Sequence, residues 1–258
     1  MRTDIRQFIL FSAAAAALVG AFVIGPVPQD PAYHLFVDRR ELFSIPNFWN
    51  VVTNAPFVVI GAMGMVLVAR GKACGGLSDL RAAYFVFFLG VFAVGFGSAY
   101  YHFHPDNQTL FWDRVPMTIA FMGFFSAVLG EHISTETCET FIWPLIALGI
   151  CSVLYWYVSE KNGLGDIRLY ALVQYLPALL LPMILFLYRS RLVPGAYLWL
   201  VLGAYLAAKI AESLDGQLYA AIRVLSGHSI KHLAAAGGAY LFYVALRRRE
   251  PAADSQET

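Results

Sequence analysis

The chain has 258 residues; 59% of them are hydrophobic, 14% are charged, and the formal net charge is +1. A soluble domain is about 45–50% apolar and about 25% charged, so this composition excludes a soluble enzyme and a disordered protein and indicates an integral membrane protein. The low net charge and the absence of a basic patch with interleaved aromatic residues exclude nucleic acid as a partner.

Apolar stretches long enough to cross a bilayer, which takes about 20 residues in a helix, recur along the chain. The last two such stretches carry ionisable residues near one end and are less regular than the others. The predicted fold class is all-α and integral to the membrane, with eight transmembrane spans. In chain order, we predict transmembrane spans at residues 8–25, 49–69, 82–101, 110–130, 141–158, 169–188, 192–214 and 228–246.

The N-terminal span could also belong to a signal peptide, because Arg2 and Arg6 precede it. However, the apolar region of a signal peptide is about 7–15 residues long and ends in an A-x-A-like site, whereas this run has 18 uncharged residues and no clear site of that kind. We therefore expect the N-terminal span to be retained. Separately, we expect the polar C-terminal tail to be disordered from residue 250 onward. The predicted organisation is an N-terminal transmembrane helix at 1–25, an outer loop at 26–48, a seven-helix catalytic bundle at 49–246 and a cytoplasmic tail at 247–258.

Eight spans place both chain ends on the same side of the membrane. With both ends in the cytoplasm, ten of the 18 lysines and arginines lie on the inner side, five lie in outer loops and three lie at the outer ends of helices. This excess agrees with the positive-inside rule. The orientation places the end of the span at 82–101, and the starts of those at 110–130 and 228–246, on the outer side.

A few polar residues stand within or at the ends of the predicted spans, where they are costly and mark function by default. Ser98 and His102 are four residues apart at the end of one helix and therefore lie on the same face. Asp113 stands near the start of the next helix, and His228 and His232, again four residues apart, open the last one. With the predicted topology, all five side chains reach the outer end of the bundle.

Three histidines at one depth are typical of a zinc site, because zinc favours four tetrahedral ligands and a catalytic site keeps one position for water. A bound zinc lowers the pKa of that water to about 7. Asp113 could accept a proton from the water and return it to a leaving amine, and Ser98 could hydrogen-bond the developing oxyanion. We therefore predict Ser98 and Asp113 as catalytic residues, and as metal ligands His102, His228 and His232.

Each of these residues also has a structural interpretation when it is taken alone. A single intramembrane histidine such as His102 is more often a helix-packing group than a ligand. Ser98 follows small residues that favour close helix packing, and Asp113 could be a helix N-terminal charge or a partner of Arg114. His104 as a fourth ligand is the weaker option. The common depth of the five polar side chains favours the metal site over these separate explanations.

The motifs around these residues resemble those of the alkaline ceramidases and their bacterial relatives, within a superfamily that includes the progestin and adipoQ receptors. The resemblance covers roughly residues 38–246. The set is specific in combination, whereas each motif alone is weak. The segments that carry it are Phe48-Trp49-Asn50-x-x-Thr53-Asn54, Gly97-Ser98-x-x-x-His102, Trp112-Asp113-Arg114-x-Pro116-Met117 and His228-x-x-x-His232.

The resemblance implies a seven-helix transmembrane bundle with one additional N-terminal transmembrane helix, the span at 8–25. It places an intramembrane zinc ion in the bundle, with the three histidines at the ligand positions and Ser98 and Asp113 beside them. It implies hydrolysis of the amide bond of a ceramide-like lipid to a fatty acid and an amine base. The expected partners are therefore a membrane lipid substrate and the bilayer itself. For a bacterial relative, the expected location is the inner membrane, with the site near the extracytoplasmic leaflet.

One departure from the family pattern concerns calcium. Animal alkaline ceramidases carry a calcium site built from acidic residues and a tryptophan that precede the E-F-W-N segment. Here Asn47 stands at the position of that glutamate, and no Trp-x-Glu pattern precedes it. Asp38 and Glu41 are present but do not recreate the set, so we do not expect calcium regulation.

Two other functions compete with the hydrolase. One is a non-enzymatic receptor or sensor in which zinc is a structural link between helices; the other is a haem protein with two axial histidines. Haem gives no role to Asp113 or to the second histidine of the last helix. Separately, Lys209 and Glu212, three residues apart, are expected to form a helix-end salt bridge, with contact to a lipid head group as the alternative.

Overall fold

The computed structural model describes residues 5–73 and 75–252, and the described chain is mostly helical. Each predicted span overlaps a helix, although the span at 49–69 covers two helices and the span at 192–214 begins on a short strand. The regular structure also includes two short 3₁₀ turns, at Pro31–His34 and Ser78–Leu80. Two short strands are present as well, β1 (Leu192–Val193) and β2 (Glu250–Pro251). The helices are α1 (Ile5–Val23), α2 (Phe48–Val52), α3 (Ala55–Ala69), α4 (Arg81–Phe103), α5 (Asn107–His132), α6 (Thr135–Lys161), α7 (Arg168–Leu187), α8 (Ala196–Ser213), α9 (Asp215–Ile222) and α10 (Gly227–Arg248).

Six helical segments of the described chain are long and apolar enough to cross a membrane: α1, the α2–α3 pair, and α4 to α7. The α8–α9 pair meets the same criterion as one broken span, bent by 82°. Large apolar side chains such as Phe11 and Phe186 point outward and are 70% and 80% exposed, as lipid-facing residues would be. The chain is therefore a multi-pass membrane protein.

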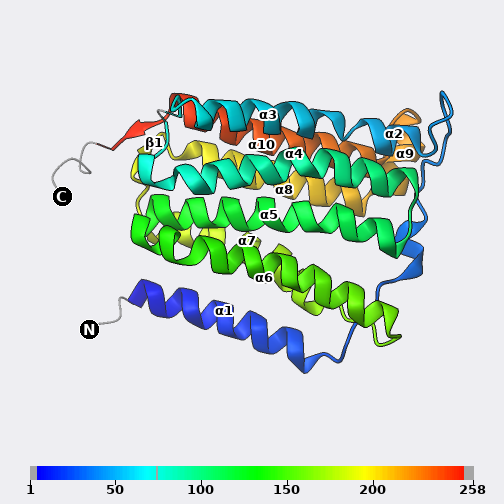
Figure 1. The fold of residues 1–258 in the computed structure, drawn as a ribbon, viewed down its shortest axis with the longest axis horizontal. Helices are drawn as coiled ribbons and strands as arrows, with labels where there is room; N and C mark the ends of the chain where they lie inside the picture. The colour runs from blue at the N-terminus through cyan, green and yellow to red at the C-terminus, as the bar shows by residue number, and fades with distance from the viewer. Residues whose placement is uncertain (1–4, 74, 253–258) are drawn as a thin grey trace.

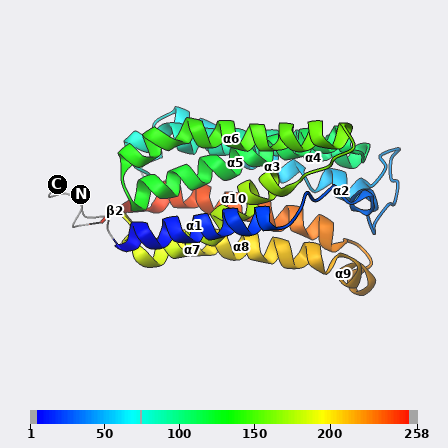
Figure 2. The same ribbon diagram turned by 90° about the horizontal axis from the view of Figure 1, so that it is seen from below.

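The helices form a bundle in which neighbours in sequence are mostly neighbours in space (Figure 1). Figure 2 shows α3 to α6 in one layer and α1, α7 and α8 in a second layer, with α10 between them. The last helix, α10, packs against both α8 and α3, whereas α7 and α8 touch each other little. The α1 helix lies at the edge of the bundle against α7.

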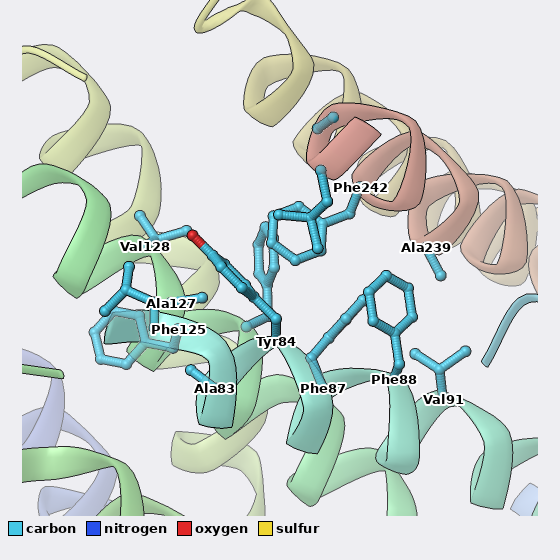
Figure 3. Packing of buried hydrophobic residues seen from close by; sticks show 14 of the residues in the cluster. Ala83, Tyr84, Phe87, Phe88, Val91, Phe125, Ala127, Val128, Ala239 and Phe242 are labelled. Atoms are coloured by element: carbon cyan, nitrogen blue, oxygen red, sulfur yellow. The ribbon is translucent and has the colours of Figure 1, made fainter. Parts of the chain in front are cut away.

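An aromatic cluster joins α4, α5 and α10 in the half of the bundle near the chain ends (Figure 3). The ring of Phe242 lies at its centre, 5.1 Å from the ring of Phe87 and 5.0 Å from that of Phe124, both nearly edge to face. Tyr84 and Phe88 complete the contacts around Phe242 at 5.9 and 6.1 Å. Because edge-to-face ring pairs are favourable beyond the area that they bury, this cluster holds three helices in register.

Glycines set how closely the central helices approach. A Cβ atom on Gly61 of α3 would lie 2.4 Å from the backbone nitrogen of Phe92 in α4. A Cβ on Gly90 of α4 would lie 2.5 Å from the backbone nitrogen of Ala120 in α5. Small residues at helix contacts are typical of packing within membranes, because they let backbones meet.

We expect Gly90→Ala to lower the free energy of unfolding by about 1–3 kcal/mol, because the added methyl group meets backbone that cannot move aside. Gly203→Ala in α8 is the matched control, since nothing lies within 4 Å of its added Cβ; it should be neutral or stabilising by up to about 1 kcal/mol. Thermal unfolding in detergent measures both. Equal effects of the two substitutions would contradict the close-approach explanation.

The loop at 26–48 is tied to the bundle by polar contacts. The backbone N–H of Gln29 donates to Glu160 Oε1 at 2.5 Å, and the N–H of Ile167 donates to the carbonyl oxygen of Val27 at 2.9 Å. Between α6 and α7, the Arg168 guanidinium donates to the Asp166 carboxylate and lowers the pKa of Asp166 to about 2. These contacts hold the loop against the ends of α6 and α7.

The predicted disorder from residue 250 onward is wrong for the first residues of that tail. Glu250–Pro251 pairs as β2 with Leu192–Val193 between α7 and α8, and the N–H of Ala252 donates to the carbonyl oxygen of Arg191 at 2.9 Å. The preceding residue Arg249 is buried. The rest of the predicted tail, residues 253–258, lies outside the described residues.

Candidate metal centre

The three histidines predicted as metal ligands meet inside the bundle. His102 ends α4, while His228 and His232 lie one turn apart in the first part of α10. One ligand nitrogen from each lies within 4.8 Å of the others, and all three residues are buried. The Nε2 atoms of His102 and His228 are 3.3 Å apart. Residues more than a hundred positions apart in sequence therefore form one cluster.

The separation of two of the ligand nitrogens fits a tetrahedral zinc ion. Two histidine nitrogens that each lie about 2.0–2.1 Å from such an ion are about 3.3 Å apart, which is the separation of the His102 and His228 nitrogens. Buried imidazoles are mostly neutral, because burial disfavours the charged form, and the neutral form is the one that binds a metal. The residues present therefore fit zinc.

Thr53 determines which nitrogen of His232 can bind a metal. Its hydroxyl donates to the carbonyl oxygen of Trp49 at 2.6 Å and lies 3.0 Å from His232 Nδ1. Since the hydroxyl hydrogen is already used, Oγ1 accepts the Nδ1 hydrogen of His232. The lone pair of His232 is then on Nε2, and the ring is held by a partner of the kind that orients metal-binding histidines.

The loop at 26–48 and α2 cover the histidines. The Phe36 ring lies 4.7 Å from the His102 ring and 5.2 Å from the His228 ring. Asn47 donates from Nδ2 to the carbonyl oxygen of His102 at 2.9 Å, and the buried Asn50 accepts from the Ser229 hydroxyl at 2.8 Å. These contacts close this end of the site and bury the histidines.

The bend between α8 and α9 helps to position the start of α10. Asp215, just after the bend, accepts the backbone N–H of His228 at 2.7 Å through its Oδ1 atom. A Cβ atom on Gly227 would lie 2.1 Å from the carbonyl oxygen of Ala211, so only glycine fits there. The predicted span at 192–214 therefore ends in a sharp turn whose polar residues hold the first turn of α10.

Ser98 and Asp113 lie beside one another on the cavity side of the histidines. Both are buried, and they line the same cavity as His232. The Ser98 hydroxyl interacts with the Asp113 carboxylate, whose Oδ1 atom has no hydrogen-bond partner among the described residues. Asp113 does not belong to the group of ligand atoms within 4.8 Å. Its position therefore suits a group that acts through a bound water rather than a metal ligand.

The cavity has a volume of about 350 Å³, in the range of small-molecule sites. Its walls come from α3, α4, α5, α7, α8 and α10, and they are mostly apolar away from the histidines. Phe121, Leu181 and Ala239 are among the apolar lining residues. It lies where α7 and α8 make little direct contact, so an acyl chain could occupy it from the lipid side.

The structure confirms one further prediction near the site and adds residues that were not predicted. The predicted salt bridge between Lys209 and Glu212 is confirmed, and Lys231 joins it with Nζ 2.9 Å from Glu212 Oε1. His104 is exposed at the end of α4 and is not part of the histidine cluster. The contact of Phe36 with the histidine rings and the pairing of Lys231 with Glu212 were not predicted. The sequence shows no motif that links either residue to the site.

Comparison with known families agrees with the motifs. The family model described as Ceramidase matches residues 43–257. The chain belongs to the ceramidase family. The five predicted site residues lie within the matched region, whereas α1 precedes it. No curated protein matches the chain.

Membership in the ceramidase family confirms the resemblance seen in the sequence. It indicates a hydrolase that acts on lipid amides, in keeping with a multi-pass membrane protein that has a largely apolar internal cavity. The three buried histidines can hold a metal ion beside that cavity.

Proposed function

We propose that this protein is a zinc-dependent intramembrane hydrolase that cleaves the amide bond of a ceramide-like lipid to a fatty acid and an amine base. The observation that supports it best is the convergence of three histidine nitrogens within 4.8 Å, next to an apolar cavity that Ser98 and Asp113 also line. His102, His228 and His232 hold the metal in this proposal. Calcium has no part in it.

A zinc ion bound there would supply a water of lowered pKa, near 7, and an electrophile for the amide carbonyl. Asp113 accepts a proton from the attacking water at its carboxylate, and the carbon–oxygen bond forms. The Ser98 hydroxyl donates a hydrogen bond to the carbonyl oxygen as that oxygen gains charge. Asp113 then delivers its proton to the amide nitrogen, the carbon–nitrogen bond breaks, and the free amine and fatty acid leave.

The membrane arrangement that we propose is a seven-helix bundle, with α8 to α10 as its last part, preceded by α1 as an additional helix. Figure 1 supports a common side for the two chain ends. The start of α1 and the strand β2 lie at the same end of the bundle, and α9 lies at the opposite end. With both ends in the cytoplasm of a bacterium, the histidines lie near the extracytoplasmic leaflet of the inner membrane. The segments at 1–25, 26–48, 49–246 and 247–258 are then the helix, outer loop, catalytic bundle and cytoplasmic tail.

A receptor with a structural zinc is the second candidate. A structural zinc has four protein ligands, whereas a catalytic zinc keeps one position open. The cluster among the described residues has three histidines, and an unpartnered carboxylate oxygen of Asp113 lines the cavity beside them. This combination favours the enzyme.

We expect Asp113→Asn to lower kcat for lipid-amide hydrolysis by about 10²- to 10⁴-fold, the usual contribution of a positioned acid–base group. The variant should keep its zinc, because Asp113 is not among the clustered ligand atoms. Release of fatty acid measured by mass spectrometry, together with metal analysis, checks both. Asp79→Asn, at an exposed aspartate of the opposite end, is the control. Unchanged turnover in Asp113→Asn would refute the proposed proton transfer.

A further inference from the structure

Arg114 is a buried cation beside the proposed reaction centre, and among the described residues it has no acidic hydrogen-bond partner. It is 3% exposed, follows Asp113 in α5, and lines the same cavity. Its Nη2 atom donates to Gln29 Oε1 at 2.5 Å, whereas Nη1 is buried with no partner among the described residues. A buried charge without a partner is costly, so this guanidinium has an open position for an anionic oxygen.

Aromatic rings hold the Arg114 guanidinium in place. Its central carbon lies 4.1 Å from the Trp156 ring centroid, 4.6 Å from that of Tyr170 and 5.8 Å from that of Tyr33. Such contacts stabilise the cation but accept no hydrogen bond from its edge in this arrangement. The guanidinium is therefore fixed in orientation, with Nη2 on Gln29 and with both hydrogens of Nη1 unpaired among the described residues.

A second positive region of the same cavity lies on α8 and α10. Lys209 and Lys231 both pair with Glu212, so one carboxylate is shared by two ammonium groups. Both lysines line the cavity, and their side chains are 29% and 19% exposed. Lys231 directly precedes His232, so this positive region adjoins the metal ligands.

The charged lining residues of the cavity are three cations, Arg114, Lys209 and Lys231, and two carboxylates, Asp113 and Glu212. A bound zinc ion would add further positive charge. A carboxylate on the substrate would balance part of that excess and match the planar guanidinium, whereas hydroxyl groups add no negative charge.

Building on the proposed hydrolase, we propose that, among ceramide-like lipid amides, this enzyme prefers those whose amine part carries a carboxylate, as in N-acyl amino acids, and that Arg114 binds this carboxylate. The acyl chain lies along the apolar wall, and the scissile carbonyl faces the histidines. The substrate carboxylate accepts a hydrogen bond from Nη1 of Arg114, with Lys231 and Lys209 adding attraction. Hydrolysis adds one water across the carbon–nitrogen bond and gives a fatty acid and a free amino acid.

The test compares N-oleoylglycine with N-oleoylglycinamide, which has the same acyl chain and amide but no charge. For the zinc-loaded wild type, we expect kcat/KM to be at least about 10-fold higher for N-oleoylglycine, because a hydrogen bond between charged groups is worth that factor or more. Arg114→Gln should remove the preference mainly through KM. Arg114→Lys, which keeps the charge but loses the fork, should retain part of it.

Binding to the metal-free protein, in which turnover is stopped, separates recognition from hydrolysis. There, we expect N-oleoylglycine to bind at least about 10-fold more tightly than N-oleoylglycinamide in the wild type and equally in Arg114→Gln. Arg168→Gln is the matched control, because Arg168 pairs with Asp166 and does not line the cavity; it should keep the preference. If Arg114→Gln does not fold, Lys231→Gln, which leaves Glu212 paired with Lys209, should still reduce the preference.

The outcomes are distinct for the two proposals. Hydrolysis of both amides at equal rates, or a preference that persists in Arg114→Gln, would overturn the role of Arg114 and leave the hydrolase intact. Arg114-dependent binding without hydrolysis of either amide or of ceramide by the zinc-loaded protein would support the recognition site and refute the proposed enzyme. Oleate, the fatty-acid product, is the third ligand. If only oleate binds through Arg114, the carboxylate recognised is that of the product, and the proposed selectivity is wrong.

Discussion

The double substitution His228→Ala/His232→Ala should abolish both metal binding and hydrolysis. Purified without chelator, the wild type should carry about one zinc per chain, and the variant should carry almost none, because two of the three ligands are lost. Hydrolysis of lipid amides should fall by about 10³-fold or more, since the metal stabilises the transition state by several kcal/mol. Elemental analysis and fatty-acid release measure the two effects on the same preparation.

The position of the two histidines makes this variant informative. They lie on one face of α10, and Thr53 and Asp215 hold that face through His232 Nδ1 and the backbone of His228. Alanine is a good helix former, so α10 should persist and the loss should be local. His104→Ala is the matched control, because His104 is exposed and outside the cluster; it should keep zinc and activity.

A folded wild type without zinc would leave the three histidines as packing groups, and the enzyme proposal would fail with them. Iron in place of zinc, with a Soret band, would support the haem alternative instead. Zinc in the wild type without turnover of any lipid amide would favour the receptor. The single measurement of metal content therefore separates the main proposal from two of its competitors.

Much of the fold was predictable because the bilayer imposes length and apolarity on each helix. Every predicted span overlaps a helix, and alternation of the spans brings Ser98, His102 and Asp113 to the same end as the two histidines of α10. That argument needs only the direction of each helix. It does not need the rotation of the helices about their axes, which is why it succeeded.

Rotation is what the sequence does not reveal, because helices that are apolar all round have no pattern that marks the inner face. The contact of Thr53 with His232 joins residues 179 positions apart and depends on how α2 and α10 face each other. The position of Phe36 depends on the path of an irregular loop. The aromatic contacts of Arg114 with Trp156 and Tyr170 likewise form only when α5, α6 and α7 are assembled.

The end of the bundle opposite the histidines carries the substitution with the largest expected effect on stability. Arg249 donates from Nη1 and Nη2 to both carboxylate oxygens of Glu131, each at 2.7 Å, and neither side chain is exposed. The Tyr84 hydroxyl donates to the same carboxylate at 2.8 Å and accepts the N–H of Leu77 at 3.1 Å. This network joins α4, α5, the loop after α3 and the segment that follows α10.

We expect Glu131→Leu to lower the free energy of unfolding by about 3–5 kcal/mol, because it leaves the Arg249 guanidinium buried and uncompensated. The double variant Glu131→Leu/Arg249→Met should recover most of that loss, since an apolar pair of similar volume is often as stable as a buried ion pair. Arg248→Met, at an exposed neighbour, should change stability by less than about 0.5 kcal/mol. Additive losses in the double variant, measured by thermal unfolding in detergent, would contradict the pairing argument, because uncoupled residues show no interaction energy in such a cycle.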